Sequence, residues 1–118
     1  MKKRVLIVDD DFGVQDVFRL ILEKAGYEVA VKGNGTDLLE DNYDLPHIFL
    51  LDKQISGVDG IDVCMHLKKH SNTKDIPVIM VSATPGLGPI AMNAGADDFL
   101  EKPFQIKELL FKISNLLR

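Results

Sequence analysis

Cysteine and tryptophan are nearly missing from this 118-residue chain, which has one Cys, at position 64, and no Trp. A single thiol cannot form an internal disulfide, so a disulfide-stapled fold is excluded. This cysteine usage is typical of a reducing compartment, and we expect a cytoplasmic protein. Cys64 itself falls on the apolar face of a predicted helix, where a small core residue is favoured over a reactive thiol.

Long apolar runs and an excess of basic residues are also absent. No stretch approaches the ~20 apolar residues that span a bilayer. The apolar stretch behind the basic start, Met1 to Arg4, is too short for the core of a signal peptide. We therefore expect no membrane partner. Acidic residues outnumber basic ones by 18 to 14, and the resulting net charge of −4 argues against nucleic acid as a direct partner.

The chain does contain a regular alternation of apolar strands and amphipathic helices. Three wholly apolar runs offer no polar face to water, which is typical of strands buried on both sides of a parallel sheet. The predicted strands are 5–8, 27–31, 48–51, 76–82 and 99–100, and the predicted helices are 14–25, 36–41, 61–70 and 106–117. The crossover rules make residues 1–118 one α/β domain, a (βα)5 doubly wound parallel five-stranded sheet with the flavodoxin-like strand order 2-1-3-4-5.

The fourth crossover is irregular. Residues 84–93 carry two prolines and two glycines, and each glycine in a helix interior costs ~1 kcal/mol relative to alanine. We expect a shortened or missing fourth helix that does not begin before Pro89. A loop or a single turn, packed by Leu87, Ile90 and Met92, is the prediction for this segment.

Acidic residues gather where the first and third strands end. Asp9 and Asp10 follow the first strand, and Asp52 closes the third. In the predicted order these strands are neighbours, and ligands bind at the carboxyl edge of such sheets. Three carboxylates in one crevice repel one another, and their oxygens suit a hard cation such as Mg²⁺. The alternative is that the acids cap the next helix, a role that we assign to Asp11.

Two more strand ends supply a hydroxyl and a cation. Ser82 closes the fourth strand, and Lys102 follows the fifth. Taken singly, the serine is a turn former and the lysine a solvated charge. Together with Asp52 and a metal ion they predict a phosphoryl-transfer site. Asp52 would be the nucleophile, Lys102 and the metal would neutralise phosphoryl oxygens, and Ser82 would donate a hydrogen bond.

A pair of histidines lies on the third predicted helix. His66 and His70 are spaced i, i+4 and so share one face of that helix. Such a pair could in principle hold a metal ion, but the sequence shows no third ligand. A solvated helix face is the favoured interpretation.

Four short motifs occur in order along the whole chain. They are Ile7-Val8-Asp9-Asp10-Asp11, Leu50-Leu51-Asp52 with Gly57-Val58-Asp59-Gly60, Val81-Ser82-Ala83, and Gly95-Ala96-Asp97-Asp98-Phe99-Leu100-Glu101-Lys102-Pro103-Phe104. Each motif alone is weak, but four in this order at these spacings are strongly specific. The chain resembles the receiver domain of two-component response regulators.

The resemblance implies a phosphorelay function. Asp52 would accept a phosphoryl group from a sensor histidine kinase or a phosphotransfer protein, and the domain would catalyse only its own phosphorylation and dephosphorylation. Mg²⁺ would be bound directly by Asp10 and Asp52. The resemblance also implies that Asp9 acts on the metal through water and that the backbone carbonyl of Gln54 is a further ligand.

The resemblance further implies a conformational switch. Ser82 and Phe99 match the hydroxyl and aromatic switch positions, and Lys102-Pro103 matches a lysine followed by a cis peptide. Many receivers signal or dimerise through the face around the fourth helix. A homodimer or a downstream protein would therefore use the 84–104 face.

The sequence departs from the family after the phosphorylation site. Lys53 stands where an aliphatic residue is usual, and Ile55-Ser56 replaces the usual Met-Pro. We therefore expect an irregular loop that is less rigid than in relatives. Two other functions compete with the receiver: an interaction domain independent of phosphorylation, and a phosphatase that works through an aspartyl phosphate. Against the phosphatase, the sequence shows neither a second acid beside Asp52 nor a cap domain.

Overall fold

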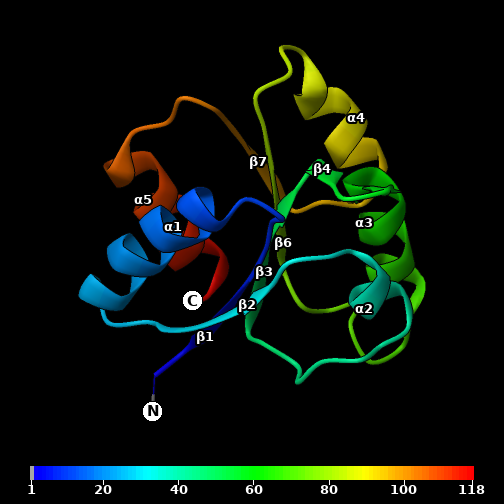
Figure 1. Cartoon of the computed structure of the whole chain (residues 1–118), viewed down its shortest axis with the longest axis horizontal. Helices are drawn as coiled ribbons and strands as arrows, with labels where there is room; N and C mark the ends of the chain where they lie inside the picture. The colour runs from blue at the N-terminus through cyan, green and yellow to red at the C-terminus, as the bar shows by residue number, and fades with distance from the viewer. Residues whose placement is uncertain (1) are drawn as a thin grey trace.

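A computed structural model describes residues 2–118 and places five parallel strands in one sheet (Figure 1). The strands are β1 (Arg4–Val8), β2 (Glu28–Lys32), β3 (Ile48–Asp52), β6 (Val78–Ser82) and β7 (Asp98–Glu101). Their order across the sheet is β2-β1-β3-β6-β7, which is the predicted 2-1-3-4-5 order. The predicted fold is confirmed, with β1 and β3 adjacent where the strand order reverses.

In the described part of the chain, five helices cover both faces of the sheet. They are α1 (Phe12–Lys24), α2 (Thr36–Leu39), α3 (Gly60–Lys69), α4 (Leu87–Asn93) and α5 (Ile106–Leu116). Figure 1 shows α1 and α5 on one side of the sheet and α2, α3 and α4 on the other. Within residues 2–118, no helix combines the length and the apolar character needed to cross a bilayer.

The sheet has a hydrophobic core on each of its two faces, and the central strand β3 contributes side chains to both. Phe49 and Leu51 pack on the side of α2, α3 and α4, whereas Ile48 and Leu50 pack on the side of α1 and α5. All four side chains are at most 2% exposed. Burial on both faces explains why this run has no polar position before Asp52.

Helix α1 begins two residues before the predicted range 14–25 and ends one residue before its end. Asp11 is its N-cap, and the Asp11 side chain accepts a hydrogen bond from the Val14 N–H at 3.1 Å. Gly26 follows the helix with φ +99°, a left-handed conformation that glycine adopts without a steric penalty. The capping role of Asp11 is therefore confirmed.

The segment after Asp52 is more regular than predicted. In place of an irregular loop, β4 (Gln54–Ile55) and β5 (Val58–Asp59) form a two-stranded antiparallel hairpin. Gly57 lies between these strands with φ +72°. Strands of two residues are too short to show a period, so the sequence pattern does not reveal them.

Helix α4 corrects the prediction for residues 84–93. It spans Leu87–Asn93, about two turns, and begins two residues before Pro89. Pro89 is the third residue of the helix, where the missing N–H removes no intrahelical hydrogen bond because the first turn has no acceptor for it. The residue before a proline is normally pushed out of the helical region, partly by its Cβ, but here that residue is Gly88.

The side chains that pack α4 also differ from the prediction. Leu87 is buried as expected, but Ile90 and Met92 are 54% and 45% exposed, and Ala91 is buried in their place. The fourth helix is thus shortened, as predicted. It is nevertheless a helix of two turns rather than a loop or a single turn, and Leu87 and Ala91 hold it on the sheet.

Cys64 belongs to the core between the sheet and α3. Its side chain is fully buried among apolar residues. Burial raises the pKa of the Cys64 thiol to about 11, so the group stays protonated and unreactive near neutral pH. The interpretation of Cys64 as a core residue is confirmed.

Candidate functional site

The predicted site residues meet at the carboxyl edge of the sheet. The parallel register of β1 and β3 brings Asp9 beside Asp52, with Asp10 next along the chain. We call these three residues the acid cluster. Ser82 is the last residue of β6, and Lys102 directly follows β7, so both reach the same edge. The convergence expected from the strand order is observed.

Lys102 links two of the acids. Its Nζ lies 3.3 Å from Asp52 Oδ1 and 3.8 Å from Asp9 Oδ2. The Asp9 and Asp52 side chains are only 4% and 13% exposed, so solvent screens these charges weakly. With Asp10, three carboxylates surround one ammonium group, and the cluster keeps excess negative charge. The Lys102-Pro103 peptide is cis, as predicted.

The acids differ in their electrostatic environment. Burial is the main cause that raises the pKa of Asp9 and of Asp52 above the ordinary value of 3.8, and neighbouring acids add to the rise. The Lys102 charge opposes the rise at both residues. The pKa of Asp10 is instead lowered, chiefly because the Ser56 hydroxyl donates to its carboxylate.

Ser56 is a site residue that the sequence analysis missed. It lies between β4 and β5 and donates twice to Asp10 Oδ2, from its hydroxyl at 2.7 Å and from its backbone N–H at 2.9 Å. No helical or strand period marks a serine in a turn. The only available signal was that Ser56 stands at a position where the family usually has proline. In the structure, the two hydrogen bonds of Ser56 connect the β4–β5 hairpin to Asp10.

Gln15 of α1 is a second missed residue. It is buried, and its Nε2 donates to the backbone carbonyl of Asp9, so it supports the strand end that carries the acids. A signal was present in the sequence. Gln15 is spaced i, i+3 and i, i+7 from Phe18 and Leu22, which form the buried face of the helix.

The acid cluster fits a hard divalent cation. Within residues 2–118, Asp9 Oδ2 is buried and has no hydrogen-bond partner, a rare state for a polar oxygen. A cation there would satisfy this oxygen and offset the repulsion among the carboxylates, and a set of oxygen donors suits Mg²⁺. In the described chain no three acidic, histidine or cysteine side chains already form a cage. Metal binding therefore needs local rotation of side chains.

Gln54 lies beside this cluster, at the start of β4. Its backbone N–H donates to Asp52 Oδ2 at 3.3 Å. The backbone at Gln54 therefore lies next to the Asp52 carboxylate. This position is consistent with the predicted use of the Gln54 carbonyl as a metal ligand, which stays a prediction.

Ser82 and Phe99 lie on the neighbouring strands β6 and β7. Ser82 is 4% exposed, and its Oγ accepts a hydrogen bond from the Thr84 N–H at 2.9 Å. The Phe99 ring packs so closely on Gly88 of α4 that a Cβ there would lie 2.6 Å from the ring Cζ. Lys112 of α5 places its Nζ 5.6 Å from the ring centroid, within the range of a cation–π contact. Phe99 is thus held between α4 and α5.

The raised pKa values predict how the metal-free protein responds to pH. A carboxyl whose pKa is higher in the folded chain than in the unfolded chain stabilises the fold below pH 3.8, and this contribution is lost as pH rises through the folded value. We therefore expect Asp52→Asn to be more stable than the parent chain at neutral pH in EDTA. Urea unfolding across a pH series measures the difference, which should shrink towards low pH. A variant less stable than the parent at neutral pH contradicts this account.

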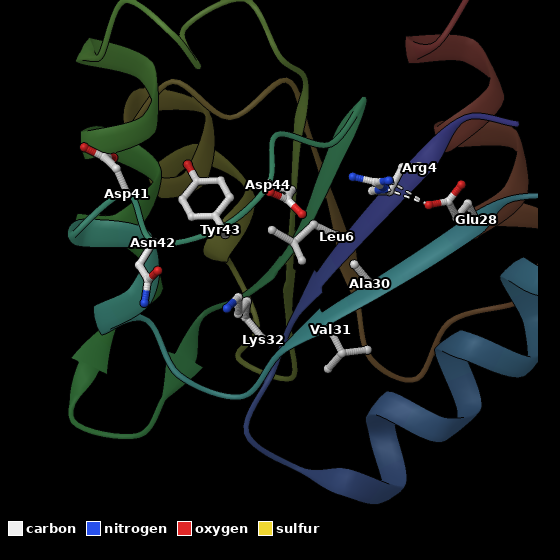
Figure 2. Close-up of a pocket in the computed structure, with 10 residues that line it drawn as sticks. All are labelled: Arg4, Leu6, Glu28, Ala30, Val31, Lys32, Asp41, Asn42, Tyr43 and Asp44. Atoms are coloured by element: carbon white, nitrogen blue, oxygen red, sulfur yellow. Dashed lines mark hydrogen bonds and ion pairs between the residues drawn. The ribbon is translucent and has the colours of Figure 1, made fainter. Parts of the chain in front are cut away.

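The hollow drawn in Figure 2 is a separate feature. It lies along β1 and β2, is lined in part by Arg4 and Glu28 near the starts of these strands, and is bordered by Asp41–Asp44. Its lining is polar and mixed in charge. The acid cluster at the carboxyl edge is therefore the better candidate for chemistry.

Comparison with known proteins identifies the family of the chain. A family model described as "Response regulator receiver domain" matches residues 5–114. The chain is similar to the DNA-binding dual master transcriptional regulator RpaA of Synechocystis, with 40% identity over 122 residues that cover 98% of this chain and 49% of RpaA. The chain spans about half the length of the curated relatives it matches. Because RpaA is described as DNA-binding, the expectation that nucleic acid is no direct partner is not supported.

Solved structures share the fold over the whole chain. A CheY-like response regulator receiver domain protein of Methanospirillum hungatei has a TM-score of 0.87 and 32% identity, and the match covers 99% of this chain and 94% of that one. The receiver domain of sensor histidine kinase PA1611 from Pseudomonas aeruginosa, solved with a magnesium ion in its active site cleft, has a TM-score of 0.88. That match covers 99% and 98% of the two chains at 23% identity, which shows a common fold.

Proposed function

The chain belongs to the family of response regulator receiver domains, and on this premise we propose that Asp52 accepts a phosphoryl group in a phosphorelay. The donor is a phosphohistidine of a sensor histidine kinase or of a phosphotransfer protein. Residues 1–118 form one receiver domain that acts in the cytoplasm. The contact of Lys102 Nζ with Asp52 Oδ1, at 3.3 Å beside the unpartnered Asp9 oxygen, carries the proposal.

The transfer needs a nucleophile and positive charge around the phosphoryl group. An Asp52 carboxylate oxygen attacks phosphorus, the P–N bond to the donor histidine breaks, and the leaving imidazole takes up a proton. Lys102 stabilises charge on the phosphoryl oxygens, and the Ser82 hydroxyl donates a hydrogen bond to one of them. The protein catalyses only this transfer and the later hydrolysis of its own aspartyl phosphate.

Mg²⁺ supplies further positive charge when it is bound. Asp10 and Asp52 would hold the ion directly, and Asp9 would act through water. The backbone carbonyl of Gln54 would be a further ligand. The buried Asp9 Oδ2 supports a cation at this site, because within the described chain it has no hydrogen-bond partner and the Lys102 ammonium lies 3.8 Å away.

Acetyl phosphate and Mg²⁺ test the proposal directly. Intact mass should show one phosphoryl group on the parent chain and none on Asp52→Asn. Asp11→Asn is the matched control, because asparagine caps a helix as well as aspartate does. A folded chain that takes no label and releases no phosphate is a phosphorylation-independent interaction domain. A chain that releases phosphate rapidly but never accumulates a label on Asp52 is a phosphatase. Either result overturns the proposal.

Phosphorylation is expected to change the environment of Phe99. The ring is wedged between Gly88 and Lys112, so any movement of Ser82 or α4 alters its packing. Moving a two-state equilibrium from 1:99 to 99:1 takes roughly 5.5 kcal/mol of differential interaction, which charge-assisted contacts to the phosphoryl group can largely supply. NMR signals of the ring should shift when beryllofluoride mimics the phosphoryl group, whereas those of Tyr27, before β2, should not. Unchanged Phe99 signals argue against an aromatic switch.

The surface next to Lys102 suits a protein donor. Phe12 and Val17 of α1 are 79% and 54% exposed, so this part of the helix presents apolar area to solvent. The groove beside them is lined by Asp11, Gly13, Val14, Val17, Phe18, Lys102, Pro103 and Phe104. Because the groove shares Lys102 with the site, a protein docked there presents its phosphohistidine close to Asp52.

Val17→Glu tests this docking surface. A carboxylate buried against an apolar partner is strongly unfavourable, so transfer from a phosphorylated kinase or phosphotransfer protein should slow roughly tenfold or more. Labelling by acetyl phosphate should be unchanged, because this small donor needs no docked protein and Val17 is exposed on α1. Equal transfer to both chains from the protein donor places the docking surface elsewhere.

The phosphorylated domain switches an output surface on the 84–104 face. Exposed Ile90 and Met92 of α4 give this face apolar area for a partner. The partner is a second copy of the chain or a downstream protein.

A further inference from the structure

Two histidines and one aspartate face one another outside the acid cluster. His66 Nε2 lies 3.1 Å from Asp41 Oδ1, and His70 Nε2 lies 3.4 Å from Asp41 Oδ2. The two imidazole centroids are 5.8 Å apart. We call these residues the His66–Asp41–His70 cluster. The proposed phosphoryl transfer uses none of them.

The fold supplies the ligand that the sequence could not reveal. His66 and His70 lie one turn apart at the end of α3. Asp41 follows α2 with φ +58°, and its N–H donates to the Leu38 carbonyl at 3.2 Å. Figure 2 shows the Asp41 carboxylate pointing towards α3 and away from the hollow. The end of α2 therefore brings a carboxylate to the histidine pair.

We propose that the His66–Asp41–His70 cluster binds a divalent transition-metal ion of the Zn²⁺ class. Ligand atoms around a tetrahedral zinc ion, with bonds of ~2.0–2.1 Å, lie ~3.3 Å from one another. The two nitrogen-to-oxygen distances here, 3.1 and 3.4 Å, are close to that spacing, although each imidazole contacts a different oxygen of Asp41. Two imidazoles and one carboxylate leave a fourth position open for water or a partner's group.

Binding needs a rearrangement of exposed side chains. As they stand, no three potential ligands in residues 2–118 converge on one point. The side chains of His66, His70 and Asp41 are 29%, 35% and 45% exposed, so they can change rotamer without disturbing the core. A bound ion then replaces the two histidine–aspartate contacts and ties the end of α2 to α3.

The donor atoms separate this site from the acid cluster. Imidazole nitrogen suits zinc, copper and nickel, whereas carboxylate oxygens alone suit magnesium. Excess Mg²⁺ should therefore fill the acid cluster and leave the His66–Asp41–His70 cluster free. The two sites can be tested independently in one protein.

Titration of the full chain with ZnCl₂ in excess Mg²⁺, followed by calorimetry at neutral pH, tests the proposal. We expect one high-affinity ion per chain. Removal of a supporting group alone typically weakens a metal site about 10–100-fold, so His66→Ala and Asp41→Asn should each weaken it at least as much. Asparagine tolerates the left-handed backbone at position 41, so Asp41→Asn should fold. His47→Gln, which changes the remaining histidine, and Asp10→Asn, in the acid cluster, should keep full zinc affinity.

NMR of the histidine rings gives a second measurement. Signals of His66 and His70 should shift until one equivalent of Zn²⁺ is added, while those of His47 stay in place. If these signals respond to pH but not to Zn²⁺, the cluster is only an ion pair and the proposal is wrong. It is equally overturned if the parent chain binds no zinc, or if His66→Ala and Asp41→Asn bind it as tightly as the parent.

Discussion

Saturating Mg²⁺ is expected to raise the free energy of unfolding by about 2.7 kcal/mol when its concentration is a hundred times Kd. The ion binds the folded chain alone, because Asp9, Asp10 and Asp52 come together only when β1 and β3 pair. Asp10→Asn should lose most of this gain, since Asp10 is proposed as a direct ligand. Urea unfolding with and without Mg²⁺ measures the effect.

Asp11→Asn is the control for this experiment. Asp11 is adjacent to Asp10, but its side chain caps α1, and asparagine preserves that hydrogen bond. The control should therefore gain as much from Mg²⁺ as the parent chain does. If Asp10→Asn gains equally, the metal is not bound at the acid cluster.

A single methyl group added at Gly60 is expected to destabilise the protein by ~1–3 kcal/mol or more, although alanine favours helix. Gly60 is the first residue of α3, and its N–H donates to the Lys53 carbonyl at 2.7 Å. A Cβ at this position would lie 2.2 Å from the Asp52 carbonyl oxygen and 2.8 Å from Lys53 Cα. Both atoms belong to the backbone, so relief requires β3 and α3 to move apart.

Gly60→Ala should also slow phosphorylation, because the displaced backbone carries Asp52. Gly33→Ala is the matched control. The nearest atom to a Cβ there is Gln15 Nε2 at 3.6 Å, an ordinary contact, so the change should stay within about 0.5 kcal/mol. Chemical denaturation and the initial rate of labelling by acetyl phosphate measure the two effects. Equal stability of the two variants contradicts the packing argument.

The strands and their order follow from local patterns. Runs such as Ile48 to Leu51 are apolar at every position because both sides of β3 are covered by helices. Five strands alternating with helices permit few topologies, so the doubly wound sheet could be predicted. Strand order then places Asp9, Asp52 and Lys102 at one edge, and their contacts bear this out.

Helix α4 shows where a local rule was applied too strictly. Pro89 was expected to mark the earliest start of the helix, but the helix begins at Leu87. A proline is excluded only where its N–H would have had a partner, and the first turn offers none. Ile90 and Met92 are exposed because Leu87 and Ala91 face the sheet. The choice of buried face depended on how α4 packs against its neighbours.

The sequence by itself determined the five strands of the parallel sheet, their order and the edge at which the acids, the serine and the lysine gather. Only the tertiary structure decided that Ser56 holds Asp10 and that Asp41 completes the histidine pair of α3. The physical reason is the separation along the sequence of the residues that interact. Periodicity reports which face of a helix or strand is buried, because burial acts on residues two to four positions apart. A contact between two side chains of different elements depends on where the folded chain places those elements.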